Sequence, residues 1–205
     1  LALLRASDVE WQWGVELANE GRDPRTRFEK AVALAERTIP SRFDLSYALD
    51  NVGIAWVNRA QWEAANGIDP TPSFAKAEEA FRRCTVEFPS LFSVHCNLAE
   101  ALNARARFGL SRGRDPTPLL AEARRTLARG EAFTAHFCLA LGWVVSASVE
   151  SQWSLLSGRD PVPAAEEAAR RLGLLRRVNP GAVTGLLETA TAHLAVAEHR
   201  LLEGL

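Results

Sequence analysis

The sequence predicts an all-α fold in which antiparallel helix pairs stack into a one-dimensional solenoid. Three observations support this prediction: a short motif returns about every 46 residues, apolar stripes with helical spacing follow each copy, and no long segment alternates with the period of a strand. A helix of about 15 residues is marginal alone in water, so neighbouring units have to pack against one another. We therefore expect about nine helices in one array over residues 1–205.

The recurring motif is Gly-x-Asp-Pro, with successive glycines 46, 46 and 45 residues apart. Glycine adopts the positive φ that commonly ends a helix, aspartate accepts hydrogen bonds from the first free N–H groups of the next helix, and proline is tolerated in a first turn. Each copy therefore predicts a helix end followed by a helix start. The copies occupy residues 21–24, 67–70, 113–116 and 158–161, and their structural caps are Asp23, Asp69, Asp115 and Asp160.

Two further observations concern the helix starts after this motif and the number of its copies. Thr71-Pro72 and Thr117-Pro118 could cap their helices equally well, two residues after the aspartate, so these two helix starts have alternative positions. Gly204 lies 46 residues beyond Gly158, at the place where a fifth copy would begin.

A short amphipathic helix is predicted after each motif. Four positions spaced 3, 4 and 3 residues apart fall on one helical stripe, which is the spacing of a face that packs on a core. The second position is alanine in every copy, and a small residue there lets a neighbouring helix approach closely. The sets are Phe28, Ala31, Ala35 and Thr38; Phe74, Ala77, Phe81 and Cys84; Leu120, Ala123, Leu127 and Gly130; and Ala165, Ala168, Leu172 and Leu175.

A longer helix with two apolar faces is predicted before the motif. In the second repeat one face runs from Leu45 to Glu63 and another carries Ala48, Ala55 and Trp62, so this helix should be sandwiched between neighbours. Turns are predicted at Ile39-Pro40, Phe88-Pro89, Gly130-Glu131 and Asn179-Pro180. The expected organisation is a partial repeat 1–40, repeats 41–89, 90–130 and 131–180, and a partial repeat 181–205.

Composition and charge exclude several classes of function. The chain is 47% hydrophobic and 24% charged, as in globular proteins, and its 24 Lys and Arg against 25 Asp and Glu give a net charge of −1. This balance provides no general attraction to nucleic acid or to an anionic membrane. Because neither a run of 18 apolar residues nor a signal-peptide layout is present, we expect a cytoplasmic protein without membrane insertion. The lack of methionine indicates a piece of a longer protein.

The sequence offers no motif for catalysis or for binding a cofactor or metal. Kinase signatures and a Walker phosphate loop are missing, and the histidines form no HExxH or HxxxH pair. Cys84 lies in a core stripe, and Cys96 follows His95 directly, which places the two side chains about 100° apart on a helix rather than face to face. We expect a non-enzymatic chain with no cofactor, no metal and no nucleic-acid partner.

The helical signatures resemble those of the tetratricopeptide repeat (TPR). The short helix, with its constant alanine, a bulky residue four positions later and a proline at the turn, resembles the second helix of that repeat. Val52-Gly53 followed by Trp56 resembles the first helix. An ordinary repeat of this family runs about 34 residues, and 12 extra residues here lengthen the first helix and create the motif loop. The resemblance implies a right-handed solenoid.

A narrower resemblance concerns the context of the array. Units with a W-x-x-x-x-G-x-D-P-x-P consensus look like the repeat tails that follow the catalytic domain of large bacterial serine/threonine protein kinases. Trp62, Phe108 and Trp153, each five residues before a motif glycine, carry this part of the resemblance. It implies that the chain is a regulatory or sensory tail whose catalytic half lies elsewhere.

In tetratricopeptide stacks, the resemblance implies, the first helices line a groove that takes an extended peptide or a helix. Register from Val52-Gly53 gives an apolar and neutral-polar wall, without the Lys/Arg set with which chaperone-binding relatives clamp a C-terminal carboxylate. The predicted groove residues are Tyr47, Asp50, Ile54, Val57 and Asn58; Ser93, Cys96, Glu100, Asn103 and Ala104; and Leu141, Val145, Ser148 and Val149.

Three functions remain open. The leading hypothesis is a non-catalytic scaffold for protein–protein interaction in the regulatory tail of a bacterial serine/threonine kinase. The second is a small-ligand or peptide sensor module of a signalling or transcriptional regulator, which needs a deep pocket with convergent polar groups. The third is a structural spacer or oligomerisation element, because the last helix has no successor repeat in this sequence and should pair with another molecule. That helix carries Leu186, Leu187, Leu194, Leu201 and Leu202.

Overall fold

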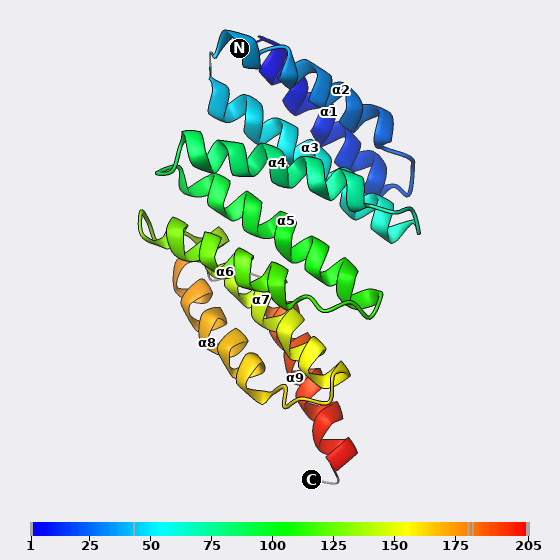
Figure 1. Cartoon of the computed structure of the whole chain (residues 1–205), viewed down its shortest axis with the longest axis vertical. Helices are drawn as coiled ribbons and strands as arrows, with labels where there is room; N and C mark the ends of the chain where they lie inside the picture. Colours follow the sequence, from blue (N-terminus) through cyan, green and yellow to red (C-terminus); the bar gives the residue numbers. More distant parts are fainter. Residues whose placement is uncertain (1, 43, 180, 182, 204–205) are drawn as a thin grey trace. The chain divides into compact units, whose positions relative to one another are not determined.

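The described part of the chain is built from helices. The computed structural model describes residues 2–42, 44–179, 181 and 183–203, and within these ranges there is no strand, which confirms the predicted all-α class. The same ranges hold nine α-helices, packed in neighbouring pairs, and a short 3₁₀ helix (Ile39–Ser41) (Figure 1). The α-helices are α1 (Ala2–Asn19), α2 (Arg25–Glu36), α3 (Leu45–Ala65), α4 (Thr71–Glu87), α5 (Phe92–Ser111), α6 (Thr117–Glu131), α7 (Phe137–Leu156), α8 (Val162–Val178) and α9 (Val183–Glu203).

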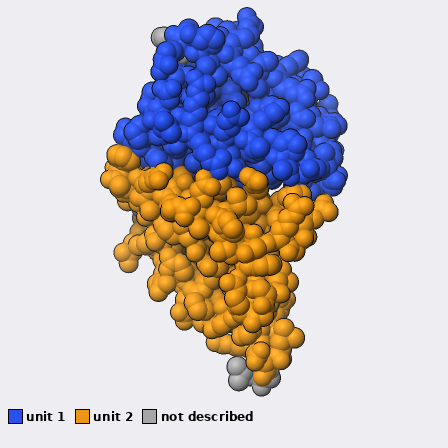
Figure 2. Space-filling view, in the orientation of Figure 1, with its two compact units in different colours: residues 1–101 blue, residues 102–205 orange. Residues whose placement is uncertain are grey.

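The chain divides into two compact units, residues 1–101 and residues 102–205 (Figure 2). The division falls within α5 and therefore inside the predicted repeat 90–130. In unit 1, α3 contacts α1, α2 and α4, and in unit 2, α7 contacts α6, α8 and α9. The two long helices α3 and α7 are thus covered on more than one side, which confirms the sandwiched position predicted from two apolar faces.

The Gly-x-Asp-Pro loops share one backbone conformation. Gly21, Gly67, Gly113 and Gly158 have φ values of 73°, 74°, 68° and 68°, which confirms the positive φ predicted for the motif glycine. In each loop the glycine N–H bonds to the carbonyl three residues back, and the next N–H bonds to the carbonyl five residues back. This is the Schellman arrangement, and it satisfies two of the carbonyls that a helix end would otherwise leave without a partner.

The aspartate of each loop holds the first N–H of the following helix. Its Oδ1 atom accepts a hydrogen bond from the backbone N–H of the residue two positions later. The carbonyl of the proline between them accepts the first i to i+4 hydrogen bond of the helix, from the N–H four residues after the proline. The helices α4 and α6 begin at Thr71 and Thr117, directly after Pro70 and Pro116 at the N-cap positions. The side chains that hold the first N–H groups are therefore those of the aspartates before these prolines, and not those of the threonines. The bonded pairs are Asp23 with Arg25, Asp69 with Thr71, Asp115 with Thr117 and Asp160 with Val162, at 3.0, 3.0, 2.8 and 2.9 Å.

The predicted stripe of each short helix forms core. The first two positions are at most 2% exposed in all four copies, and the alanine of the second position is fully buried each time. At the third and fourth positions, Leu172 and Thr38 are partly buried while the remaining residues are buried. This pattern confirms the core prediction with two exceptions, Leu172 at a third position and Thr38 at a fourth. The predicted turn residue Pro180 and the fifth motif glycine, Gly204, lie outside the described residues.

A buried carboxylate explains why a glutamate belongs to the apolar face of α3. Glu63 is 4% exposed, and its two oxygens accept hydrogen bonds from Arg59 Nε and Ser73 Oγ, both at 2.7 Å. Arg59 also pairs with Glu29 of α2 at 2.6 Å. A buried charge is tolerated when it is paired and hydrogen-bonded, and this network joins α2, α3 and α4.

Candidate functional site

Four of the predicted groove residues of α3 lie on one stripe of the helix. Tyr47, Asp50, Ile54 and Asn58 follow one another at intervals of three or four residues and are partly buried. Val57 is 4% exposed and belongs to the core. The surface that α3 offers to a partner is therefore polar at three of these four positions.

Asp8 of α1 is bonded to α3 beside this stripe. Its Oδ1 accepts a hydrogen bond from Asn51 Nδ2 at 2.8 Å, and its Oδ2 accepts one from Tyr47 Oη. The bond to Asp8, together with burial, raises the pKa of Tyr47, so the phenol remains a donor. Arg5 lies 3.8 Å from Asp8 with its own side chain 72% exposed, and an exposed pair of this kind contributes little.

Two further carboxyls, one in the stripe and one on α5, have amide partners. Asp50 Oδ1 accepts a hydrogen bond from Asn97 Nδ2 of α5 at 2.7 Å, and burial raises the pKa of Asp50 by more than this bond lowers it. Glu100 is an exposed residue, and desolvation of its carboxyl by the neighbouring protein raises its pKa against a smaller opposing effect of the hydrogen bond with Gln61. We call Asp8, Tyr47, Asp50, Asn97 and Glu100 the acidic face of unit 1.

The remaining predicted groove residues offer less surface. Asn103 is 2% exposed, and its Nδ2 donates to the Gly142 carbonyl at 3.1 Å while its Oδ1 accepts from Ser146 Oγ at 2.8 Å. The polar atoms of Asn103 are thus used inside unit 2. Cys96, Ser148 and Val149 are also buried, whereas Ser93, Ala104, Leu141 and Val145 are partly buried.

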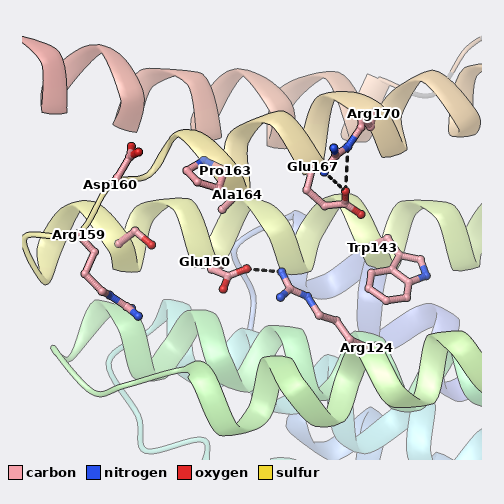
Figure 3. Close-up of a pocket in the computed structure, with 10 residues that line it drawn as sticks. Arg124, Trp143, Glu150, Arg159, Asp160, Pro163, Ala164, Glu167 and Arg170 are labelled. Carbon is pink, nitrogen blue, oxygen red and sulfur yellow. Dashed lines mark hydrogen bonds and ion pairs between the residues drawn. The ribbon is translucent and has the colours of Figure 1, made fainter.

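Sequence reasoning missed a surface hollow of about 410 Å³ in unit 2. It lies where α6, α7 and the beginning of α8 meet, next to the fourth Gly-x-Asp-Pro loop (Figure 3). Its lining combines three arginines with three acids: Arg124, Arg159 and Arg170, and Glu150, Asp160 and Glu167. Trp143 closes one end of the hollow in Figure 3.

Most of the charge in this hollow is neutralised by its own pairs. Arg124 contacts Glu150 at 2.5 Å, and Arg170 contacts Glu167 at 2.6 Å (Figure 3). Burial alone would raise the pKa of Glu167, but hydrogen bonds from Arg171 and Arg170 outweigh it and lower the pKa. Because these charges already have partners, the hollow has little attraction left for an ionic ligand.

A hollow of about 290 Å³ lies at the corresponding place in unit 1, between α2, α3 and α4. Its lining includes Val52 and Trp56, and the Lys76 ammonium lies 4.0 Å from the centre of a Trp56 ring. Val52 lies 91 residues before Trp143, and Lys76 lies 91 residues before Glu167. The same interval separates Gly67 from Gly158. The repeat interval could therefore have located both hollows as equivalent positions, although neither lining forms a motif.

Comparison with known proteins gives no family assignment. No family model, no curated protein and no solved structure matches the chain. In the part of the chain that the structure describes, no group of three or more His, Cys, Asp or Glu residues is placed to hold a metal ion. None of the helices described there combines the length and the apolar composition that a membrane crossing requires.

Proposed function

We propose that the chain is a non-catalytic scaffold for protein–protein interaction, and that its acidic face binds a basic segment of a partner. The observation that carries this proposal is that the carboxyls of Asp50 and Glu100 are desolvated and have no ion pair within the described part of the chain. Both carboxyls are desolvated enough to raise their pKa, and among the described residues neither forms an ion pair. Carboxyls that lack an ion pair, such as these two, favour a ligand that brings the cations.

The physical reason is the balance between desolvation and charge pairing. Desolvation disfavours the ionised carboxylate, and an opposite charge nearby restores it. A Lys or Arg side chain that reaches Asp50 or Glu100 therefore gains an interaction with a carboxylate that, among the described residues, has amide partners but no competing cation. Charge complementarity of this kind increases specificity for the partner and the rate of its association.

The position of these groups favours an extended segment over a compact ligand. Asp8, Tyr47 and Asp50, and Asn97 and Glu100, come from three different helices, α1, α3 and α5. Hydrogen bonds between the helices hold their side chains in place before any partner arrives. Because these side chains are already fixed, they lose little conformational freedom on binding. The site can therefore bind a flexible chain, whose own loss of freedom is then the main entropic cost.

The same proposal includes the architecture and its context. We assign the array to right-handed, TPR-like repeats of about 46 residues, in the regulatory tail of a bacterial serine/threonine kinase. The support is the recurrence of Gly-x-Asp-Pro loops with one conformation, the constant alanine of the short helices and the aromatic position before each later loop.

The test is calorimetric titration of the intact chain with a capped peptide of about ten residues that alternates Arg and Ala. The double variant Asp50→Asn with Glu100→Gln should weaken binding about ten-fold or more, because hydrogen bonds to charged groups contribute about 1.5–3 kcal/mol each. The matched control, Glu16→Gln with Glu166→Gln, removes the same charge from exposed positions. Equal weakening by both double variants, or equal binding of a Glu/Ala peptide, would overturn the proposal.

A further inference from the structure

An apolar pocket of about 260 Å³ lies in unit 2. The turn between α6 and α7 and the last turns of α8 form its walls. Leu139, Ala140 and Leu174 supply apolar surface, and Ala135 and His136 close it on the side of the turn. His136 is fixed there because its ring accepts a hydrogen bond from the Cys138 N–H at the start of α7.

The surroundings of this pocket are unusually apolar for an exposed surface. Leu174, which lines it, is 46% exposed, and Phe133 in the neighbouring turn and Phe137 at the start of α7 are 53% and 41% exposed. Exposed apolar side chains that cluster are characteristic of binding surfaces, whereas single ones are common everywhere. The pocket and these aromatic side chains together offer a site for a hydrocarbon group.

The charged residues at the edge of the pocket differ in their partners. Glu131 pairs with Arg171 at 3.3 Å, and Arg171 in turn pairs with Glu167 and lies over the Trp143 ring. Arg177 lines the pocket and is exposed, and it forms no ion pair with any residue that the structure describes. The one charge at the edge that is available to a ligand is therefore a guanidinium.

We propose that this pocket binds a small amphipathic carboxylate, with its hydrocarbon part against Leu139, Ala140 and Leu174 and its carboxylate on Arg177. The guanidinium suits a carboxylate because its N–H groups match the two oxygens in a bidentate arrangement. The volume limits the hydrocarbon part: at ~30 Å³ for a water-sized group, the pocket holds roughly eight or nine such groups. An eight-carbon acid therefore fits, and a larger ligand would extend beyond the walls.

The experiment titrates the intact chain with sodium octanoate, octanol, octylamine and acetate, and follows binding by amide NMR shifts and calorimetry. Octanoate should bind most tightly, octanol more weakly, and acetate not measurably. Arg177→Gln should weaken octanoate binding about ten-fold and leave octanol binding unchanged, because it removes one charged hydrogen-bonding group and no apolar surface. Arg176→Gln is the matched control, since Arg176 is also exposed on the last turn of α8 and does not line the pocket.

A second variant tests the apolar part of the site. Ala140→Leu places a larger side chain in the pocket and should abolish the binding of both octanoate and octanol, while circular dichroism and thermal melting check that the fold persists. The proposal is overturned if octylamine binds as well as octanoate, if Arg176→Gln and Arg177→Gln have equal effects, if Ala140→Leu binds normally, or if no ligand shifts the pocket residues. Tighter binding of acetyl-Gly-Leu than of octanoate would also overturn it, in favour of a peptide C-terminus as the occupant.

Discussion

Gly53 of α3 lies directly against the ring of Phe81 in α4. A Cβ atom added at Gly53 would stand 2.4 Å from Phe81 Cε1, and the Phe81 side chain is fully buried. The ring thus occupies the space that any side chain at residue 53 would need. Gly14 with Phe28 and Gly142 with Leu127 show the same relationship, at 2.6 and 2.7 Å. Close contact between a long helix and a short helix depends on glycine at these places.

Gly53→Ala should therefore destabilise the protein even though alanine favours helix. Placing a methyl group into a filled core costs about 1–3 kcal/mol, and urea denaturation measures the loss. Gly173→Ala is the matched control, because no atom lies within 4 Å of a Cβ atom there and the helix should gain up to about 1 kcal/mol. Opposite signs for the two variants are the expected result, and a stabilised Gly53→Ala protein would contradict the packing argument.

The aspartate of the second loop should contribute stability through its hydrogen bond and not through its charge. Asp69 accepts bonds from the Thr71 N–H at 3.0 Å and the Thr71 hydroxyl at 2.7 Å. Asp69→Ala should lower the unfolding free energy by about 1 kcal/mol, as for other helix caps, whereas Asp69→Asn retains an acceptor and should lose much less. Thermal unfolding of both variants distinguishes the two contributions, and equal losses would show that the charge matters more than the acceptor.

The acidic face should make stability depend on pH in a definite direction. The folded-state pKa of Asp50 is raised above its ordinary value of 3.8, so the folded chain binds this proton more readily than the unfolded chain. The ionised Asp50 therefore destabilises the folded chain at pH values above its raised pKa. This destabilisation disappears as the pH falls from the raised pKa toward 3.8. Asp50→Asn should therefore stabilise the protein at about pH 7.5, with a gain that shrinks on acidification.

Urea titrations of the wild type and the Asp50→Asn variant at several pH values test this prediction. Asp115→Asn serves as a comparison of opposite sign, because hydrogen bonds from Thr117 lower the pKa of Asp115. The ionised Asp115 therefore stabilises the folded chain at pH values above its ordinary pKa, and this stabilisation is lost as the pH falls through the lowered pKa of the folded state. If Asp50→Asn gave the same change in stability at every pH, the proposed desolvation of Asp50 would be wrong.

The last helix should mediate self-association. Leu187, Leu194 and Leu201 are seven residues apart on α9 and are 64%, 59% and 79% exposed, so they form an apolar stripe with the spacing of a helix-pairing seam. Leu194→Glu should shift the chain toward monomer in light scattering at high concentration. Leu156→Glu places the same charge at an exposed position of α7 and should have no such effect. A wild-type chain that stays monomeric at every concentration would count against this prediction. The predicted contribution of Leu186 concerns a side chain outside the described ones.

The elements that could be predicted from the sequence are those that local chemistry determines. A glycine that needs positive φ and an aspartate that reaches the next N–H act within a few residues, so the motif located helix ends such as Gly67 and helix starts such as Thr71 correctly. The spacing of Phe74, Ala77 and Phe81 likewise determined which face of α4 is buried. Periodicity reports on one helix at a time, and for these features one helix is enough.

The candidate site was less accessible to this reasoning because it depends on several helices together. Periodicity cannot distinguish Asn58, which is partly buried, from Val57, which is 4% exposed. It also cannot indicate that the polar atoms of Asn103 are used by Gly142 and Ser146. Among the described residues Asp50, Glu100 and Arg177 form no ion pair, and this property of the assembled units has no signature in the spacing.

The closed loops also determine how such a structure can come apart. Each loop contains its own hydrogen bonds to backbone groups of the two helix ends that it joins, so these two helices can move away from the rest of the unit together with those bonds intact. Pulling a single helix out of such a hairpin breaks the loop bonds as well as the apolar contacts. The smallest cooperative piece is then a hairpin, and amide hydrogen exchange should reveal α3 and α4, or α7 and α8, opening as pairs.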